Sequence, residues 1–66
     1  MVSEELKRYR IAALLTQRRL GEMLGYEGRN AERMIQRWES GELPVPLKHI
    51  RKVHDILNMP FEKLIP

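Results

Sequence analysis

The sequence predicts an all-α fold. Apolar residues recur at the three- and four-residue spacing of helices, whereas few segments show the alternation that is typical of a half-buried strand. The first proline is Pro44, so no proline interrupts a helix over the first two thirds of the chain. Glycines at positions 21, 25, 28 and 41 supply turn and helix-end signals before it. We expect five helices in one domain, residues 1–66.

The first helix is predicted to begin at Ser3. A serine is a favoured cap, and the next two residues, Glu4 and Glu5, place negative charge at the positive end of the helix. The residues predicted to share its inner face are Leu6, Tyr9, Arg10 and Ala13.

Thr16 is predicted to cap a second helix, and Gly25 is predicted to end it with a left-handed residue. The inward-facing residues of this helix are predicted to be Leu20, Met23 and Leu24. The segment Tyr26–Arg29 then forms a polar turn in this interpretation.

A third helix is predicted from Ala31 to Ser40, with Asn30 as its cap and Gly41 as its stop. With a step of about 100° per residue, Ile35 and Trp38 fall on the same side as Ala31. The opposite side carries Arg33, Gln36, Arg37 and Ser40. This helix therefore has one apolar face and one basic, amide-rich face.

Two further helices follow the Pro-rich connection. Pro46 is suited to the first turn of the fourth helix, and Asn58 is suited to its end. The inner stripe of the fourth helix is predicted to contain Leu47, Ile50, Val53, His54 and Leu57. Pro60 can begin a last short helix that carries Phe61, Leu64 and Ile65.

The overall charge is only weakly informative. Twelve Lys and Arg against nine Asp and Glu give a net charge of +3 and a pI near 9.7. This balance suits a nucleic-acid partner but also an ordinary solvated surface. The absence of cysteine excludes a disulfide framework and favours the cytoplasm. The longest apolar run, Ile11–Leu15, is far too short to span a membrane, and no leader pattern is present.

No constellation of residues points to catalysis. The chain has two histidines, no cysteine and no pair of carboxylates in a pocket-like pattern. We therefore expect no metal, no cofactor, no small-molecule ligand and no enzymatic activity. His54 and Met34 are expected to pack against apolar side chains, and His49 is expected to be exposed.

The basic face of the third helix favours DNA as a partner. Arginine and glutamine bind the edges of guanine and adenine in a major groove, which is wide enough for one helix. The alternative is a solvated face without a function. Glu32 is open to three interpretations: it could accept from cytosine, pair with an arginine, or repel phosphate.

A set of separate positions resembles one known family. The matching residues are Leu15, Thr16, Gln17, Leu20, Gly21, Leu24, Gly25, Ile35, Arg37, Trp38, Glu39 and Gly41, with Arg10 seven positions before the glutamine. In these positions the chain resembles the Cro/C1-type, or phage-repressor-like (XRE), helix-turn-helix family, and the similarity covers roughly residues 6–64. The resemblance implies a compact five-helix, lambda-repressor-like DNA-binding domain with its motif at about residues 16–40.

The resemblance also implies two structural roles. The two helices of the motif cross closely, so the fifth position of the motif must be small, and Gly21 stands where the family usually has alanine. Arg10 and Glu39 resemble a partly buried ion pair that ties the first helix to the end of the third. The alternative is two independent surface charges.

Two positions depart from the family pattern. The family has six residues from the glycine of the turn to the isoleucine, whereas ten separate Gly25 from Ile35. We expect about four extra residues in an enlarged turn, within residues 26–30. Leu14 stands where the family often has a helix-ending glycine, so the first helix is expected to end differently or to run on to Leu15.

The predicted DNA contacts fall into two groups. The residues predicted to contact bases are Arg33, Arg37, Gln36 and Glu32. The residues predicted to contact the backbone are Gln17, Arg18, Arg29, Asn30, Ser40 and Lys48. By resemblance, Gln17 donates to a phosphate; its alternative is an exposed residue at a helix start.

The sequence as a whole favours a sequence-specific regulator of transcription that binds double-stranded DNA. The resemblance favours a small phage or mobile-element repressor or autorepressor, which binds a palindromic operator as a homodimer. Candidate dimer contacts are Val45, Phe61 and Ile65, whereas Leu47 and Leu64 are assigned to the core. The alternative function is a protein-binding adaptor or antitoxin-like partner, which a docking loop at Tyr26–Arg29 would favour.

Overall fold

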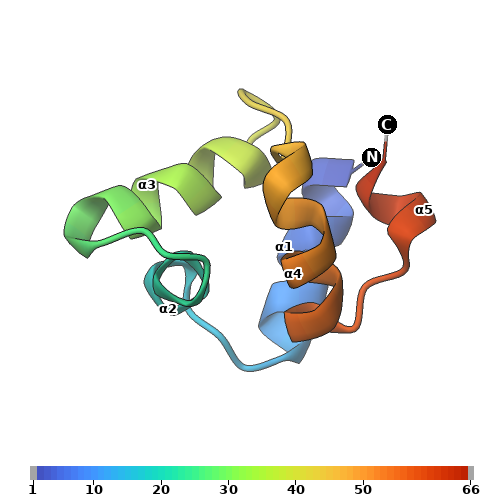
Figure 1. Cartoon of the computed structure of the whole chain (residues 1–66), viewed down its shortest axis with the longest axis horizontal. Helices are drawn as coiled ribbons and strands as arrows, with labels where there is room; N and C mark the ends of the chain where they lie inside the picture. The colour runs from blue at the N-terminus through green and yellow to red at the C-terminus, as the bar shows by residue number, and fades with distance from the viewer. Residues whose placement is uncertain (1, 66) are drawn as a thin grey trace.

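The computed structural model describes residues 2–65, which form five α-helices and contain no strand. The helices are α1 (Val2–Ala12), α2 (Gln17–Met23), α3 (Gly28–Glu39), α4 (Leu47–Leu57) and α5 (Phe61–Leu64). In Figure 1, α2 and α3 lie together on the left, and α1, α4 and α5 lie together on the right. The prediction of an all-α fold with five helices is confirmed.

All five helices contribute to one apolar core. Its buried members are Leu6, Leu20, Leu24, Ile35, Trp38, Val45, Ile50, Val53, Leu57, Met59 and Leu64. Met59 was not predicted to be buried, because it lies in the short connection between α4 and α5. Val45, predicted as a dimer contact, is instead part of this core, so that prediction is wrong.

The start of α1 differs from the prediction. The helix begins at Val2, so Ser3 lies within its first turn and is not its cap. Leu6 and Arg10 are buried and Tyr9 is half-buried, as expected. Ala13 is exposed, because the helix ends at Ala12 and the chain turns away.

Leu14 ends α1 in the conformation that glycine usually adopts. Its φ is +60°, and its amide donates to the carbonyl of Ile11, while the amide of Leu15 donates to the carbonyl of Arg10. These two hydrogen bonds form a Schellman motif around a left-handed residue. The helix therefore ends at the family's usual position without the family's glycine, and it does not run on to Leu15.

Leu14→Gly should make the folded chain about 0.5–1 kcal/mol more stable. The leucine side chain is 92% exposed, so its removal uncovers almost no buried surface, whereas the left-handed backbone no longer carries a Cβ. Urea unfolding followed by circular dichroism measures the difference. Leu14→Ala keeps the Cβ and is the matched control; a Leu14→Gly chain that is less stable than Leu14→Ala would contradict the prediction.

The residues predicted to begin and end α2 do so in the structure. The Thr16 hydroxyl accepts a hydrogen bond from the amide of Arg19 at 3.0 Å. Gly25, at φ +102°, ends the helix, and the amides of Gly25 and Tyr26 donate to the carbonyls of Glu22 and Gly21. This is a second Schellman motif, so the direction in which the chain leaves α2 is fixed.

The turn after α2 is not enlarged. It contains residues 24–27, and α3 begins at Gly28 after Glu27, so Asn30 lies in the first turn of the helix and does not cap it. The extra residues lengthen α3 to 12 residues, about one turn more than the family spacing implies. Both the prediction of an enlarged turn at residues 26–30 and the prediction of an Asn30 cap are therefore wrong.

The C-terminal helices bury most of the expected residues. Ile50, Val53 and Leu57 of α4 are buried, and Asn58 ends the helix at φ +55°. Leu47 was assigned to the core but is 86% exposed at the first position of α4. The assignment of Leu64 of α5 to the core is confirmed.

Candidate nucleic-acid interface

The two helices of the motif touch through their backbones. Gly21 of α2 is buried against Ala31 of α3, and a Cβ placed on Gly21 would overlap the carbonyl oxygen of Ala31. Ala31 itself is completely buried. The predicted need for a small residue at position 21 is therefore confirmed, and the contact fixes α3 relative to α2 near the beginning of α3.

The far end of α3 is fixed by a buried ion pair. Arg10 Nε lies 2.6 Å from Glu39 Oε2, and Arg10 Nη2 lies 3.2 Å from Glu39 Oε1. Arg10 Nη1 also donates to the carbonyl of Leu15 at 2.8 Å. The Arg10 and Glu39 side chains are 11% and 4% exposed, so the predicted ion pair is confirmed and the alternative of two separate surface charges is wrong.

Gln17 joins the same network. Its Nε2 donates to Glu39 Oε1 at 3.0 Å, which links the start of α2 to the end of α3. The primary amide has two N–H groups, so one remains for another acceptor. Gln17 is half-buried, and the alternative of a fully exposed helix-start residue is therefore wrong.

The outward side of α3 is polar along its whole length. The exposed residues on this helix and its C-cap are Arg29, Asn30, Glu32, Arg33, Gln36, Arg37 and Ser40. Ile35 and Trp38, on the opposite side, are buried as predicted. A shallow cavity of about 380 Å³ lies over the second half of this surface, lined by Arg33, Gln36, Arg37, Ser40 and Glu42.

The charges on this surface are not equivalent. Arg37 Nε lies 3.7 Å from Glu42 Oε2, just beyond the end of α3. The Ser40 hydroxyl is also used locally, since it donates to the carbonyl of Arg37. Among residues 2–65, no carboxylate lies within ion-pair distance of Arg29 or Arg33, and the first turn of α3 contains no acidic residue.

The other predicted backbone contacts lie on neighbouring helices. Arg18 is exposed on α2 and pairs with Glu22 at 3.5 Å, a separation at which two solvated charges contribute little. Lys48 is exposed in the first turn of α4. These side chains reach solvent and are available to a ligand.

The turn between α2 and α3 packs against α4 through Tyr26 and His49. The Tyr26 hydroxyl lies 3.0 Å from His49 Nε2, and both rings pack edgewise or tilted on Trp38 at 6.1 and 5.8 Å. His49 is half-buried, so its predicted exposure is wrong. Tyr26 is also half-buried and Arg29 is helical, so residues 26–29 do not form the docking loop that would favour the alternative function.

His49 should make the fold less stable as the pH falls. Partial burial, and then the positive charges of Lys48 and Lys52, lower the pKa of His49 from its ordinary value of 6.5. Folding therefore favours the neutral imidazole, and this contribution is complete above about pH 6.5 and is lost as the pH falls below it. The urea midpoints at pH 7.5 and pH 5.5 should differ less for His49→Gln than for the natural chain, because glutamine does not titrate. An equal difference in the two proteins would show that His49 does not cause the loss of stability.

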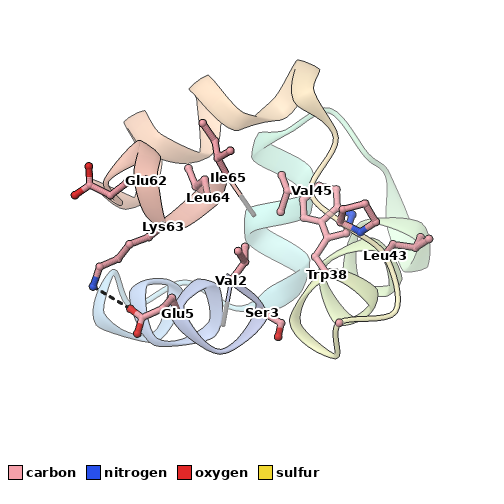
Figure 2. A pocket seen from close by; sticks show the side chains of 12 residues that line it. Val2, Ser3, Glu5, Trp38, Leu43, Val45, Glu62, Lys63, Leu64 and Ile65 are labelled. Carbon is pink, nitrogen blue, oxygen red and sulfur yellow. Dashed lines mark hydrogen bonds and ion pairs between the residues drawn. The ribbon is translucent and has the colours of Figure 1, made fainter.

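An apolar groove lies on another face of the molecule. It has a volume of about 650 Å³ and is bounded by the start of α1, the connection from α3 to α4, and α5 (Figure 2). Ile65 lines it and is 55% exposed, whereas Phe61 is 43% exposed and stacks on His54 at 3.9 Å. His54 is half-buried and also contacts the Met59 carbonyl through Nδ1, consistent with the predicted packing role.

Residues 2–65 show neither a metal-binding cluster nor a membrane-spanning helix. No group of three or more His, Cys, Asp or Glu side chains is arranged to hold a metal ion. None of the helices in this range combines the length and the hydropathy that a membrane crossing requires.

Comparison with known proteins gives one match. A family model described as helix-turn-helix matches residues 6–64, which is nearly the whole chain and includes all five helices except the start of α1. No curated protein and no solved structure matches the chain.

Proposed function

Because the chain belongs to the Cro/C1-type helix-turn-helix family and is a DNA-binding transcription regulator, we propose that it recognises operator DNA with the outward side of α3. One observation carries this proposal. Polar side chains line that side of α3, while Ala31, Ile35 and Trp38 hold its other side in the core. The helix is thus a rigid element that presents hydrogen-bonding side chains to a major groove.

Among the exposed residues predicted to contact bases, Arg33, Gln36 and Glu32 keep that role in this proposal, whereas the roles of Arg29 and Arg37 depend on the register of α3. Arginine donates two hydrogen bonds to guanine, glutamine pairs with adenine, and glutamate accepts from cytosine. The proposed backbone contacts come from the free N–H of Gln17 and from Arg18, Asn30 and Lys48. Ser40 is the weakest of the predicted contacts, because its hydroxyl already serves the end of α3.

We further propose that two copies bind a palindromic operator as a homodimer and repress a promoter. One domain of this size covers little DNA, so two copies on half-sites about 34 Å apart give useful affinity. Ile65 lines the groove of Figure 2 and is 55% exposed, and Phe61 is 43% exposed on the same short helix region, which supports a contact between copies. We also propose that the protein is cytoplasmic, that it is of phage or mobile-element origin, and that it acts on its own promoter.

Arg33→Ala should weaken binding to the selected operator by about tenfold to a hundredfold, because a bidentate contact with guanine contributes about 1–3 kcal/mol. The operator is first obtained by selection from a random DNA pool, and affinity is then measured by fluorescence anisotropy. Binding by the natural chain should fall steeply with salt concentration.

Arg51→Ala is the matched control, since Arg51 is an exposed arginine on α4. This variant should bind the operator within about twofold of the natural chain. If Arg33→Ala folds and binds as tightly as Arg51→Ala, the outward side of α3 does not contact the bases. Sedimentation of the complex tests the dimer separately, because a single copy on the operator would refute it.

A further inference from the structure

The extra turn of α3 changes which of its side chains can reach the bases. In helix-turn-helix proteins the N-terminal residues of the second helix of the motif contact the base edges. Here that helix begins at Gly28, so its first two turns carry Arg29, Asn30, Glu32 and Arg33. Arg29 therefore occupies a base-contacting position, although the sequence alone placed it with the backbone contacts.

The packing of α2 on α3 supports this register. The backbones of the two helices meet at Gly21 and Ala31, and Ala31 lies between Arg29 and Arg33 in the chain. Neither arginine is paired with a carboxylate of residues 2–65, whereas Arg37, at the other end of α3, is paired with Glu42. Arg29 and Arg33 thus have no ion-pair partner in the half of α3 that leads into the groove, although the exposed Glu32 lies between them in the chain.

From this geometry we infer that Arg29 and Arg33 each bind one guanine, and that each half-site contains two guanines about two base pairs apart. Four residues of helix advance by about 6 Å, and successive base pairs are separated by about 3.4 Å. Bidentate donation to guanine O6 and N7 is the commonest specific contact of arginine. This inference rests on the proposed function and names the DNA that α3 selects.

The same geometry gives Arg37 a different role. Its guanidinium is about two turns of helix from Arg29, and Glu42 lies beside it at 3.7 Å. This exposed pair contributes little energy, but Arg37 lies beyond the N-terminal turns of α3 that reach the base edges. Arg37 is therefore a positioning residue that contacts the backbone, and the identity of the base beneath it matters little.

Lysine substitutions separate the two kinds of contact. Lysine keeps the positive charge but lacks the planar fork that binds guanine in two places. Selection from a random DNA pool should give the natural chain a motif with both guanines. Arg29→Lys should lose preference at one guanine and Arg33→Lys at the other, each by about tenfold. Arg37→Lys should keep the whole motif.

A modified base gives an independent readout on the same proteins. Replacing the guanine assigned to Arg29 with 7-deazaguanine removes the N7 acceptor, so the natural chain should bind more weakly and Arg29→Ala should bind no worse than before. If Arg29→Lys and Arg29→Ala retain the natural motif and lose affinity equally on all sequences, Arg29 is a phosphate contact and the inference is wrong. A natural chain that selects no motif at all would instead overturn the proposed function.

Discussion

Glu39→Ala should lower the free energy of unfolding by about 3–5 kcal/mol, because it leaves the Arg10 guanidinium buried without its counter-charge. The carboxylate accepts from Arg10 Nε, from Arg10 Nη2 and from Gln17 Nε2, so three donors lose their acceptor together. A domain of 66 residues is stable by only about 3–10 kcal/mol. The change therefore removes a large fraction of the total stability of the domain.

Urea unfolding followed by the fluorescence of Trp38, the only tryptophan, measures this loss. Gln17→Ala is the graded control, since it removes one neutral donor and should cost about 1 kcal/mol. The double variant Arg10→Met/Glu39→Met should cost much less than the sum of the two single changes, because it leaves no unpaired charge. A Glu39→Ala chain within about 1 kcal/mol of the natural one would show that the pair is effectively solvated.

Local signals predicted most of the helix ends correctly. Thr16, Gly25, Gly41 and Asn58 each stand at the helix end to which they were assigned, because capping and left-handed conformations depend on only a few neighbouring residues. The prediction that Ser3 caps the first helix is wrong. A serine can also lie inside the first turn of a helix, and its local propensity does not distinguish that position from the cap.

The length of α3 could not be predicted from the turn spacing. Four extra residues can lengthen the connection between two helices, but they can also add about one turn of helix. In the second case, residues after the insertion are rotated by only about 40° about the helix axis, so the buried face is kept. The sequence did contain a signal, since Ala31 lies six residues after Gly25, as the family spacing requires, and Ile35 lies one turn later on the same face. Both residues are completely buried.

The candidate site was predictable where one helix determines it and not where distant segments meet. The polar side of α3 follows from helical periodicity, which a single segment contains. By contrast, the contacts of Tyr26 with His49 and of Arg37 with Glu42 depend on how α4 and the connection after α3 fold back. The first of these contacts has no signature in the local sequence.

Gly21→Ala should destabilise the chain by about 1–3 kcal/mol, although alanine is the usual family residue and is the better helix former by about 1 kcal/mol. The new Cβ would overlap the carbonyl oxygen of Ala31 and would lie 2.6 and 2.7 Å from its C and Cα atoms, all of them backbone, so α2 and α3 would have to separate. The same separation would tilt α3 and weaken binding to DNA.

Gly25→Ala distinguishes a steric clash from backbone strain. Gly25 has a φ of +102° and nothing within 4 Å of an added Cβ, so its substitution should cost only about 1–2 kcal/mol. The two variants are compared by urea unfolding, and Gly21→Val should be worse than Gly21→Ala because its branched side chain meets the same backbone. If Gly21→Ala instead stabilises the chain, helix propensity outweighs contact, and α2 and α3 do not approach as closely as the backbone contact at Ala31 requires.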